Sequence, residues 1–181
     1  VSKLVGEEMC KAYSQRFGLN YVILRYFNCY GPYQTAQFVI SKFIKEVIKG
    51  KSPIINGDGN QLRSYTYVSD TAEATILCIS EKKAVNKILN IGNGKNPISI
   101  ISLANKIISQ AGKIGIIEPK FLKDFSDADR SADREIFERF CDSTLARETL
   151  NWDPVVTLDE GISKVIQNGT IFDRWEDTYD E

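Results

Sequence analysis

Residues 21–28 constrain the fold more than any other segment, because Tyr-Val-Ile-Leu-Arg-Tyr-Phe-Asn carries apolar or aromatic side chains on both alternating faces. A strand of this kind is typical of the interior of a parallel sheet. Apolar residues at helical spacing predict a helix over residues 1–17, which Gly18 ends. Strand and helix signals go on alternating along the chain, so we expect an α/β fold.

The remaining elements are read from apolar periodicity, caps and stops. Asp70 and Glu73 have the spacing of a capping box and predict a helix from residue 70 to about residue 80. Ser99 and Thr157 are expected to cap two later helices. The other expected elements are a helix over 36–49, strands at 53–55, 63–68 and 88–91, and a helix from 142.

Composition excludes several classes of function. The 23 basic and 24 acidic residues are mixed along the chain and leave a net charge of −1, so we expect no nucleic-acid partner and no anionic membrane surface. The chain has no histidine, which excludes Ser-His-Asp catalysis and His-ligated zinc from these residues. No apolar run approaches the roughly 20 residues of a membrane span.

The four cysteines are far apart and have apolar neighbours, so we expect buried, reduced thiols and a cytoplasmic location. They are Cys10, Cys29, Cys78 and Cys141. The loop 92–95, Gly-Asn-Gly-Lys, invites a phosphate-loop interpretation, but Pro97 stands where a third glycine is needed. We therefore expect a tight structural turn there and no metal or dinucleotide fingerprint.

Two segments carry distinctive chemistry. Residues 25–32 read Arg-Tyr-Phe-Asn-Cys-Tyr-Gly-Pro. The purely structural interpretation is a buried strand that ends in a Gly-Pro turn. Residues 57–70 begin Gly-Asp-Gly, reach an arginine at Arg63 and end Val-Ser-Asp. An arginine offers a planar fork of donors that grips a phosphate bidentately, which lysine cannot do.

Together with Ser2-Lys3 at the start of the first helix, these segments resemble the extended short-chain dehydrogenase/reductases, in particular the NAD-dependent nucleotide-sugar epimerase/dehydratase family. The resemblance implies that Lys3 holds the nicotinamide ribose and assists a catalytic tyrosine that would precede Val1. It implies that Tyr26 lies near the nicotinamide, that Asn28 meets the diphosphate or sugar, and that Arg63 contacts the diphosphate.

A third segment adds weight to the resemblance. Arg130 and Asp133 fit an Arg-x-x-Asp pattern that precedes Asp142 and the sequence Leu-Asn-Trp-Asp-Pro at 150–154. The resemblance makes Arg130 a second diphosphate ligand and Asp133 a partner of the ribose or base. Asn56 stands where relatives often carry an aromatic residue that packs on the base.

The implied fold is the C-terminal part of a Rossmann-like parallel sheet plus a small α/β substrate-binding lobe. Residues 1–34 would belong to the NAD-binding domain and 35–181 mainly to the lobe, with a return strand near 88–91. We expect the chain to be part of a longer enzyme. On their own, residues 1–181 should be inactive, and residues 21–28 should lack a neighbouring parallel strand. The full-length protein could form a homodimer.

The implied activity is NAD-dependent epimerisation or dehydration of a nucleotide-diphosphate sugar through a transient keto-sugar. Two alternatives stay open. The first is a nucleotide-sugar decarboxylase or 4,6-dehydratase, and the second is a sensor that binds nucleotides on the same fold without turnover.

Overall fold

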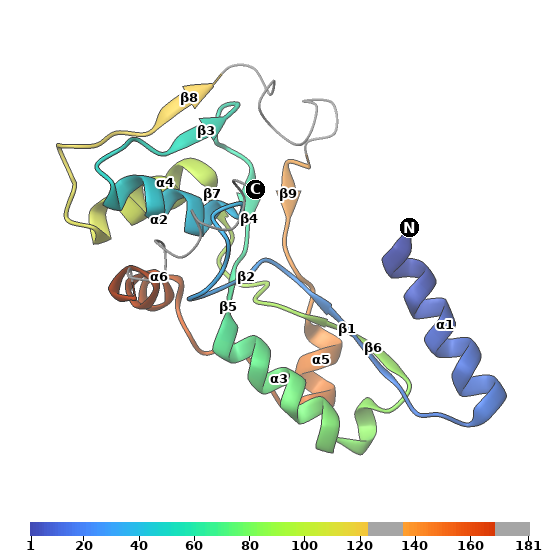
Figure 1. Ribbon diagram of the computed structural model, residues 1–181. Coiled ribbons are helices and arrows are strands. Elements are labelled where there is room, and N and C mark those ends of the chain that lie inside the picture. The colour runs from blue at the N-terminus through green and yellow to red at the C-terminus, as the bar shows by residue number, and fades with distance from the viewer. Residues whose placement is uncertain (123–135, 169–181) are drawn as a thin grey trace, which may run out of the picture.

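The computed structural model describes residues 1–122 and 136–168. Its longest strands, β1 (Val22–Tyr26) and β6 (Lys87–Ile91), pair in parallel over their full length (Figure 1). The strand predicted near 88–91 is therefore present as β6. The expectation that residues 21–28 lack a parallel neighbour was wrong, because β6 returns beside β1 after a long excursion through the rest of the chain.

Helices lie on both faces of this two-stranded sheet (Figure 1). On one face, Val22 and Leu24 pack against α3 (Val68–Ser80) and α5 (Thr144–Leu150) in a small core that includes Trp152. On the other face, Arg25 donates two hydrogen bonds of 2.7 and 2.6 Å to Glu7 of α1 (Ser2–Phe17). The predicted first helix is confirmed, although it buries none of its own residues here.

A second and larger core lies among α2 (Val39–Ile48), α4 (Ile100–Gln110) and α6 (Leu158–Gln167). Its fully buried side chains include Phe43, Ile44, Leu103, Ile107 and Ile162. The predicted caps of α4 and α6 are confirmed, because the side-chain oxygens of Ser99 and Thr157 each accept a backbone N–H at 3.2 Å. A 3₁₀ turn at Lys82–Ala84 leads from α3 into β6.

Short strands connect the two cores in three small sheets. Parallel pairs form between β2 (Cys29–Tyr30) and β5 (Thr66–Tyr67), and between β3 (Ile54–Asn56) and β8 (Lys120–Leu122). The third sheet has the order β7 (Ile98–Ser99), β4 (Leu62–Arg63), β9 (Glu138–Arg139). The single strand predicted at 63–68 is therefore two, β4 and β5, which serve different sheets.

The predicted capping role of Asp70 was wrong. Helix α3 begins at Val68, so Asp70 lies inside the first turn, and the residue is only 2% exposed. That carboxylate accepts the backbone N–H of Val156 at 3.0 Å, which attaches the segment before α6 to α3. Asp70 thus satisfies a distant backbone group instead of a local one.

Two smaller expectations can be compared with the structure. The loop 92–95 is a structural turn, since a Cβ on Gly94 would lie 2.0 Å from the backbone oxygen of Cys141. Cys78 and Cys141 are buried as predicted, Cys29 is half-buried, and the prediction for Cys10 was wrong because it is exposed on α1. Within residues 1–122 and 136–168, no helix is long and apolar enough to cross a membrane.

Candidate ligand-binding site

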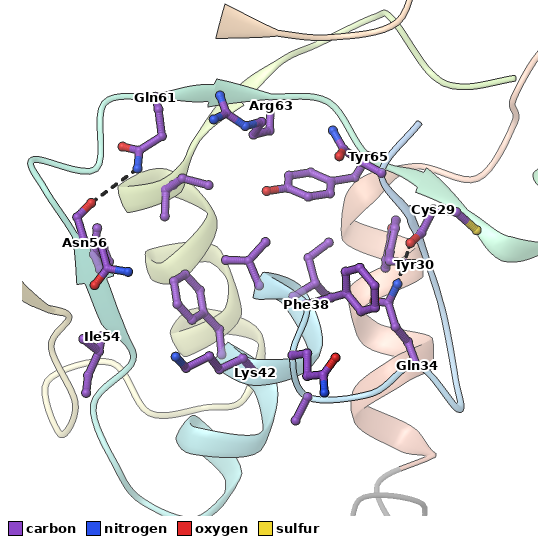
Figure 2. A pocket seen from close by; sticks show the side chains of 18 of the residues that line it. Cys29, Tyr30, Gln34, Phe38, Lys42, Ile54, Asn56, Gln61, Arg63 and Tyr65 are labelled. Carbon is purple, nitrogen blue, oxygen red and sulfur yellow. Dashed lines mark hydrogen bonds between the residues drawn. The ribbon is translucent and has the colours of Figure 1, made fainter. Parts of the chain in front are cut away.

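A pocket of about 530 Å³ opens between the β2–α2 connection, α2, β3, β4 and β9 (Figure 2). Three cationic side chains line it, Lys42, Arg63 and Arg139. None of the lining residues that the structure describes carries a carboxylate. The pocket therefore has the charge to bind an anion, with apolar walls from α2 and β3.

Arg63 and Arg139 are direct partners in the parallel pairing of β4 with β9. Neighbouring strands lie about 4.8 Å apart, and residues paired in register point to the same face of the sheet. The side chains of Arg63 and Arg139 therefore leave the backbone side by side. Arg63 is only 7% exposed and donates from Nη1 to the carbonyl oxygens of Leu62 at 2.7 Å and Phe137 at 3.1 Å. These bonds hold the guanidinium within the pocket wall.

Tyr65 presents its hydroxyl to the same pocket, as Figure 2 shows. The Tyr65 Oη is shielded from solvent and has no hydrogen-bond partner within the described part of the chain. Burial raises the pKa of Tyr65 more than the charges of Arg63 and Arg139 lower it. Because its pKa is raised, the hydroxyl stays protonated and can donate a hydrogen bond. A ligand atom that accepts this bond would stabilise the buried hydroxyl.

Asn28 lies at the edge of the pocket, where β1 has ended and β2 begins. Its Nδ2 donates to the backbone oxygen of Ser64 at 2.8 Å, and its Oδ1 accepts from Nη2 of Arg139 at 3.4 Å. The structure thus brings together two of the predicted site residues, Asn28 and Arg63, and adds Arg139 to them.

The structure does not bring Lys3 and Tyr26 together. The Tyr26 hydroxyl lies 3.0 Å from Thr75 Oγ1 of α3, whereas Lys3 is exposed on α1, which contacts the opposite face of β1 through Arg25. Side chains alternate along a strand, so Phe27, two residues after Arg25, is the aromatic residue on the α1 face. Neither Lys3 nor Tyr26 lines the pocket.

Arg130 and Asp133 lie outside the described residues. Arg139, which sequence reasoning missed, has the same spacing to Asp142 that Arg130 has to Asp133. It also lies five residues before α5, at whose start Asp142 accepts the N–H of Thr144 at 3.0 Å. That proximity to the helix was the available signal for Arg139.

Tyr65 and Lys42 were also missed as pocket residues. Tyr65 follows Arg63 by two positions, and Lys42 lies one turn into α2. Taken together, the lining side chains can bind a dianion through bidentate arginine contacts and a tyrosyl donor.

The sequence is similar to those of known proteins. A protein of Methanocaldococcus jannaschii named "Putative UDP-glucose 4-epimerase" is 39% identical over 169 residues, which are 92% of this chain and 51% of that protein. A UDP-N-acetyl-alpha-D-glucosaminuronate decarboxylase of Bacillus cytotoxicus is 34% identical over 92% of this chain and 51% of its own length.

The fold also matches solved structures. The crystal structure of UDP-glucuronic acid 4-epimerase from Bacillus cereus, in complex with UDP-glucuronic acid and NAD, superposes with a TM-score of 0.79 at 31% identity, over 91% of this chain and 50% of that one. The chain thus spans about half the length of the relatives that it matches. Residues 1–92, just over half of the chain, match the model of the NAD dependent epimerase/dehydratase family, and the chain belongs to that family.

Proposed function

We propose that this chain binds the nucleotide-diphosphate sugar of an NAD-dependent epimerase, with the diphosphate held between Arg63 and Arg139. The observation that carries the proposal is their direct pairing across β4 and β9, on the wall of a pocket without described carboxylates. A diphosphate carries two anionic groups that match two guanidinium forks in charge and geometry. Tyr65 would donate its hydroxyl to the same ligand.

The two ends of the pocket suggest how the ligand lies. The sugar would extend toward Asn28, since ligands of parallel sheets bind beyond the carboxyl ends of the strands. The nucleoside would lie toward Asn56 and Ile54 of β3, with Phe38 on the opposite wall. Arg130 and Asp133 remain proposed contacts to the diphosphate and to the ribose or base.

NAD would lie on the other side of Asn28, on the face of β1 that α1 covers. When bound, NAD accepts a hydride from the sugar and returns it. The side chains present fit only its nicotinamide-ribose end: Lys3 can donate from its ammonium to ribose hydroxyls, and Phe27 supplies an apolar surface on the same face as α1. Tyr26 is directed to Thr75 instead, so we prefer Phe27 as the cofactor contact.

Epimerisation is the preferred outcome of the reaction. A relative that is 39% identical carries an epimerase name, against 34% for a decarboxylase, and the ligand-bound structure with 31% identity is also that of an epimerase. The decarboxylase and 4,6-dehydratase activities are the alternatives. Four free cysteines support a cytoplasmic protein, and the exposed apolar side chains of α1, among them Leu4, Met9 and Phe17, support a homodimer.

The proposal is tested by calorimetry with UDP on the purified protein. Replacing Arg63 by Ala should weaken binding by about 1.5–3 kcal/mol, roughly 10- to 150-fold, which is the range for loss of a charge-assisted hydrogen bond. Arg63→Lys should recover only part of the loss, since the planar fork is gone. Arg139→Ala should weaken binding to a similar degree.

Arg16→Ala is the matched control, because Arg16 lies on α1 and does not line the pocket. Unchanged UDP affinity in both Arg63→Ala and Arg139→Ala would remove the pocket from the site. Activity is tested separately, by following inversion of a UDP-sugar by NMR with the whole gene product and NAD.

A further inference from the structure

We infer that Thr66 is a positioning residue, whose side-chain hydroxyl holds Phe27 and Asn28 in place between the cofactor and the sugar. The inference rests on the proposed function, because it takes Phe27 as a contact of NAD and Asn28 as a contact of the sugar. Thr66 is only 1% exposed and does not line the pocket, so it can act on the ligands only through its neighbours.

The Thr66 hydroxyl joins the ends of the two longest strands. It donates a hydrogen bond to the carbonyl oxygen of Phe27, which directly follows β1, at 3.3 Å. It also accepts the backbone N–H of Asn93, two residues after β6, at 2.7 Å. A hydroxyl carries one donor and two acceptor lone pairs, so it makes both bonds at once. A side chain of β5 thus connects the carboxyl ends of β1 and β6.

Backbone groups hold residues 27 and 28 as well. The N–H of Thr66 donates to the carbonyl oxygen of Asn28 at 3.2 Å, and the N–H of Phe27 donates to that of Ile91 at 3.0 Å. Asn28 has a φ of 41°, in the left-handed region, an uncommon conformation that its surroundings have to hold. A substitution of Thr66 keeps all these backbone groups and removes only the hydroxyl, so the contribution of the hydroxyl can be measured by itself.

Loss of the hydroxyl should displace this turn because of the groups that it leaves behind. Valine has nearly the volume of threonine, so Thr66→Val keeps the packing, but the Phe27 oxygen and the Asn93 N–H lose their partner at an enclosed position. An unsatisfied buried donor or acceptor is costly, and the turn would shift so that these groups find other partners. Because a misplacement of about 1 Å can slow a reaction roughly 100-fold, a small shift of Phe27 and Asn28 is enough to impair hydride transfer.

The competing explanation is that Thr66 only stabilises the fold, and ligands with and without a sugar separate the two. With the whole gene product, Thr66→Val should weaken UDP-glucose binding roughly 3- to 10-fold in calorimetry, whereas UDP affinity should change less than about 2-fold. The kcat for inversion of the UDP-sugar with NAD should fall roughly 10- to 100-fold. Equal losses of affinity for UDP and UDP-glucose would overturn the inference, and so would an unchanged kcat.

Rescue by a conservative variant isolates the hydroxyl. Thr66→Ser keeps the hydroxyl and should stay within about 2-fold of the unsubstituted protein in both affinities and in kcat, whereas Thr66→Ala should behave like Thr66→Val. Serine and alanine differ only by the hydroxyl, so this pair decides the question if thermal unfolding shows that the valine variant does not fold. A serine variant as impaired as the alanine variant would overturn the inference.

Thr71→Val is the matched control. Thr71 is also buried and donates its hydroxyl to a backbone oxygen, that of Tyr67 at 3.4 Å, but it does not line the pocket. This substitution should leave both affinities and kcat unchanged. The same losses in Thr71→Val as in Thr66→Val would assign the effect to general destabilisation and overturn the inference. Absence of UDP binding by the unsubstituted protein would instead overturn the proposed function.

Discussion

Gly161 provides a stringent test of how tightly the larger core is packed. It lies inside α6, where glycine is normally about 0.8–1.0 kcal/mol worse than alanine. A Cβ at this position would lie 2.0 Å from Tyr30 Oη, 2.7 Å from Tyr30 Cζ and 2.9 Å from Tyr67 Cδ2. Because Tyr30 is only 3% exposed, its ring cannot swing into solvent to relieve the contact.

The size of the effect follows from opposing contributions. Overpacking a core costs about 1–3 kcal/mol. Displacing Tyr30 also weakens the hydrogen bond from its hydroxyl to the Leu158 carbonyl oxygen, now 3.4 Å long, at about 0.5–1.5 kcal/mol. After the gain in helix propensity is subtracted, we expect Gly161→Ala to lower the free energy of unfolding by about 1–3 kcal/mol.

Urea denaturation measures this change as a lower midpoint with an unchanged slope. Gly6→Ala is the matched control, since Gly6 is also helical but has nothing within 4 Å of the place that a Cβ would occupy, and this substitution should not reduce stability. Adding Tyr30→Phe to Gly161→Ala should recover part of the loss, because the nearest atom is then gone. A Gly161→Ala protein as stable as the parent would refute the argument from close packing.

Two further predictions concern titratable groups. Burial, together with the negative charge of Asp142, raises the pKa of Cys141 to about 11. At pH 8, iodoacetamide should therefore label the exposed Cys10 far faster than Cys141, as measured by mass spectrometry of the peptides. Equal labelling rates would contradict the burial of Cys141. The hydrogen bond from Lys106 lowers the pKa of Asp159, so this carboxylate contributes stability above its unfolded pKa of about 4 and loses that contribution as the pH falls through its folded pKa. Asp159→Asn should therefore lower the free energy of unfolding by up to about 1 kcal/mol at pH 7, a small amount because the ion pair with Lys106 is partly exposed to solvent. At about pH 2 the substitution should leave the free energy of unfolding unchanged in urea denaturation. An equal loss at both pH values would exclude the ion pair as the cause.

Local signals in the sequence were reliable where the physical cause is local. The caps at Ser99 and Thr157 follow from side-chain oxygens that reach N–H groups three residues ahead. Strand β1, Val22–Tyr26, follows from the run of apolar residues at 21–28, which is typical of a strand in a parallel sheet. In the same way, the motifs around Asn28 and Arg63 predicted two residues that meet at one pocket.

The errors arose where a residue serves a distant partner. Asp70 has the spacing of a helix cap but satisfies Val156, 86 residues away in the chain. Residues 21–28 were expected to lack a parallel neighbour, but β6, which lies far along the chain, pairs with β1. Periodicity describes which residues share a face, but it does not say what covers that face.

The sequence by itself determined the α/β class, the main helices and the family, because these depend on side-chain periodicity, capping chemistry and motif spacing within short stretches. Only the tertiary structure decided that Arg139 is the arginine beside Arg63. Strands β4 and β9 contain two residues each, too few for a pattern to specify their pairing. Their register is set by the packing of the elements on either side, which brings together residues 76 positions apart.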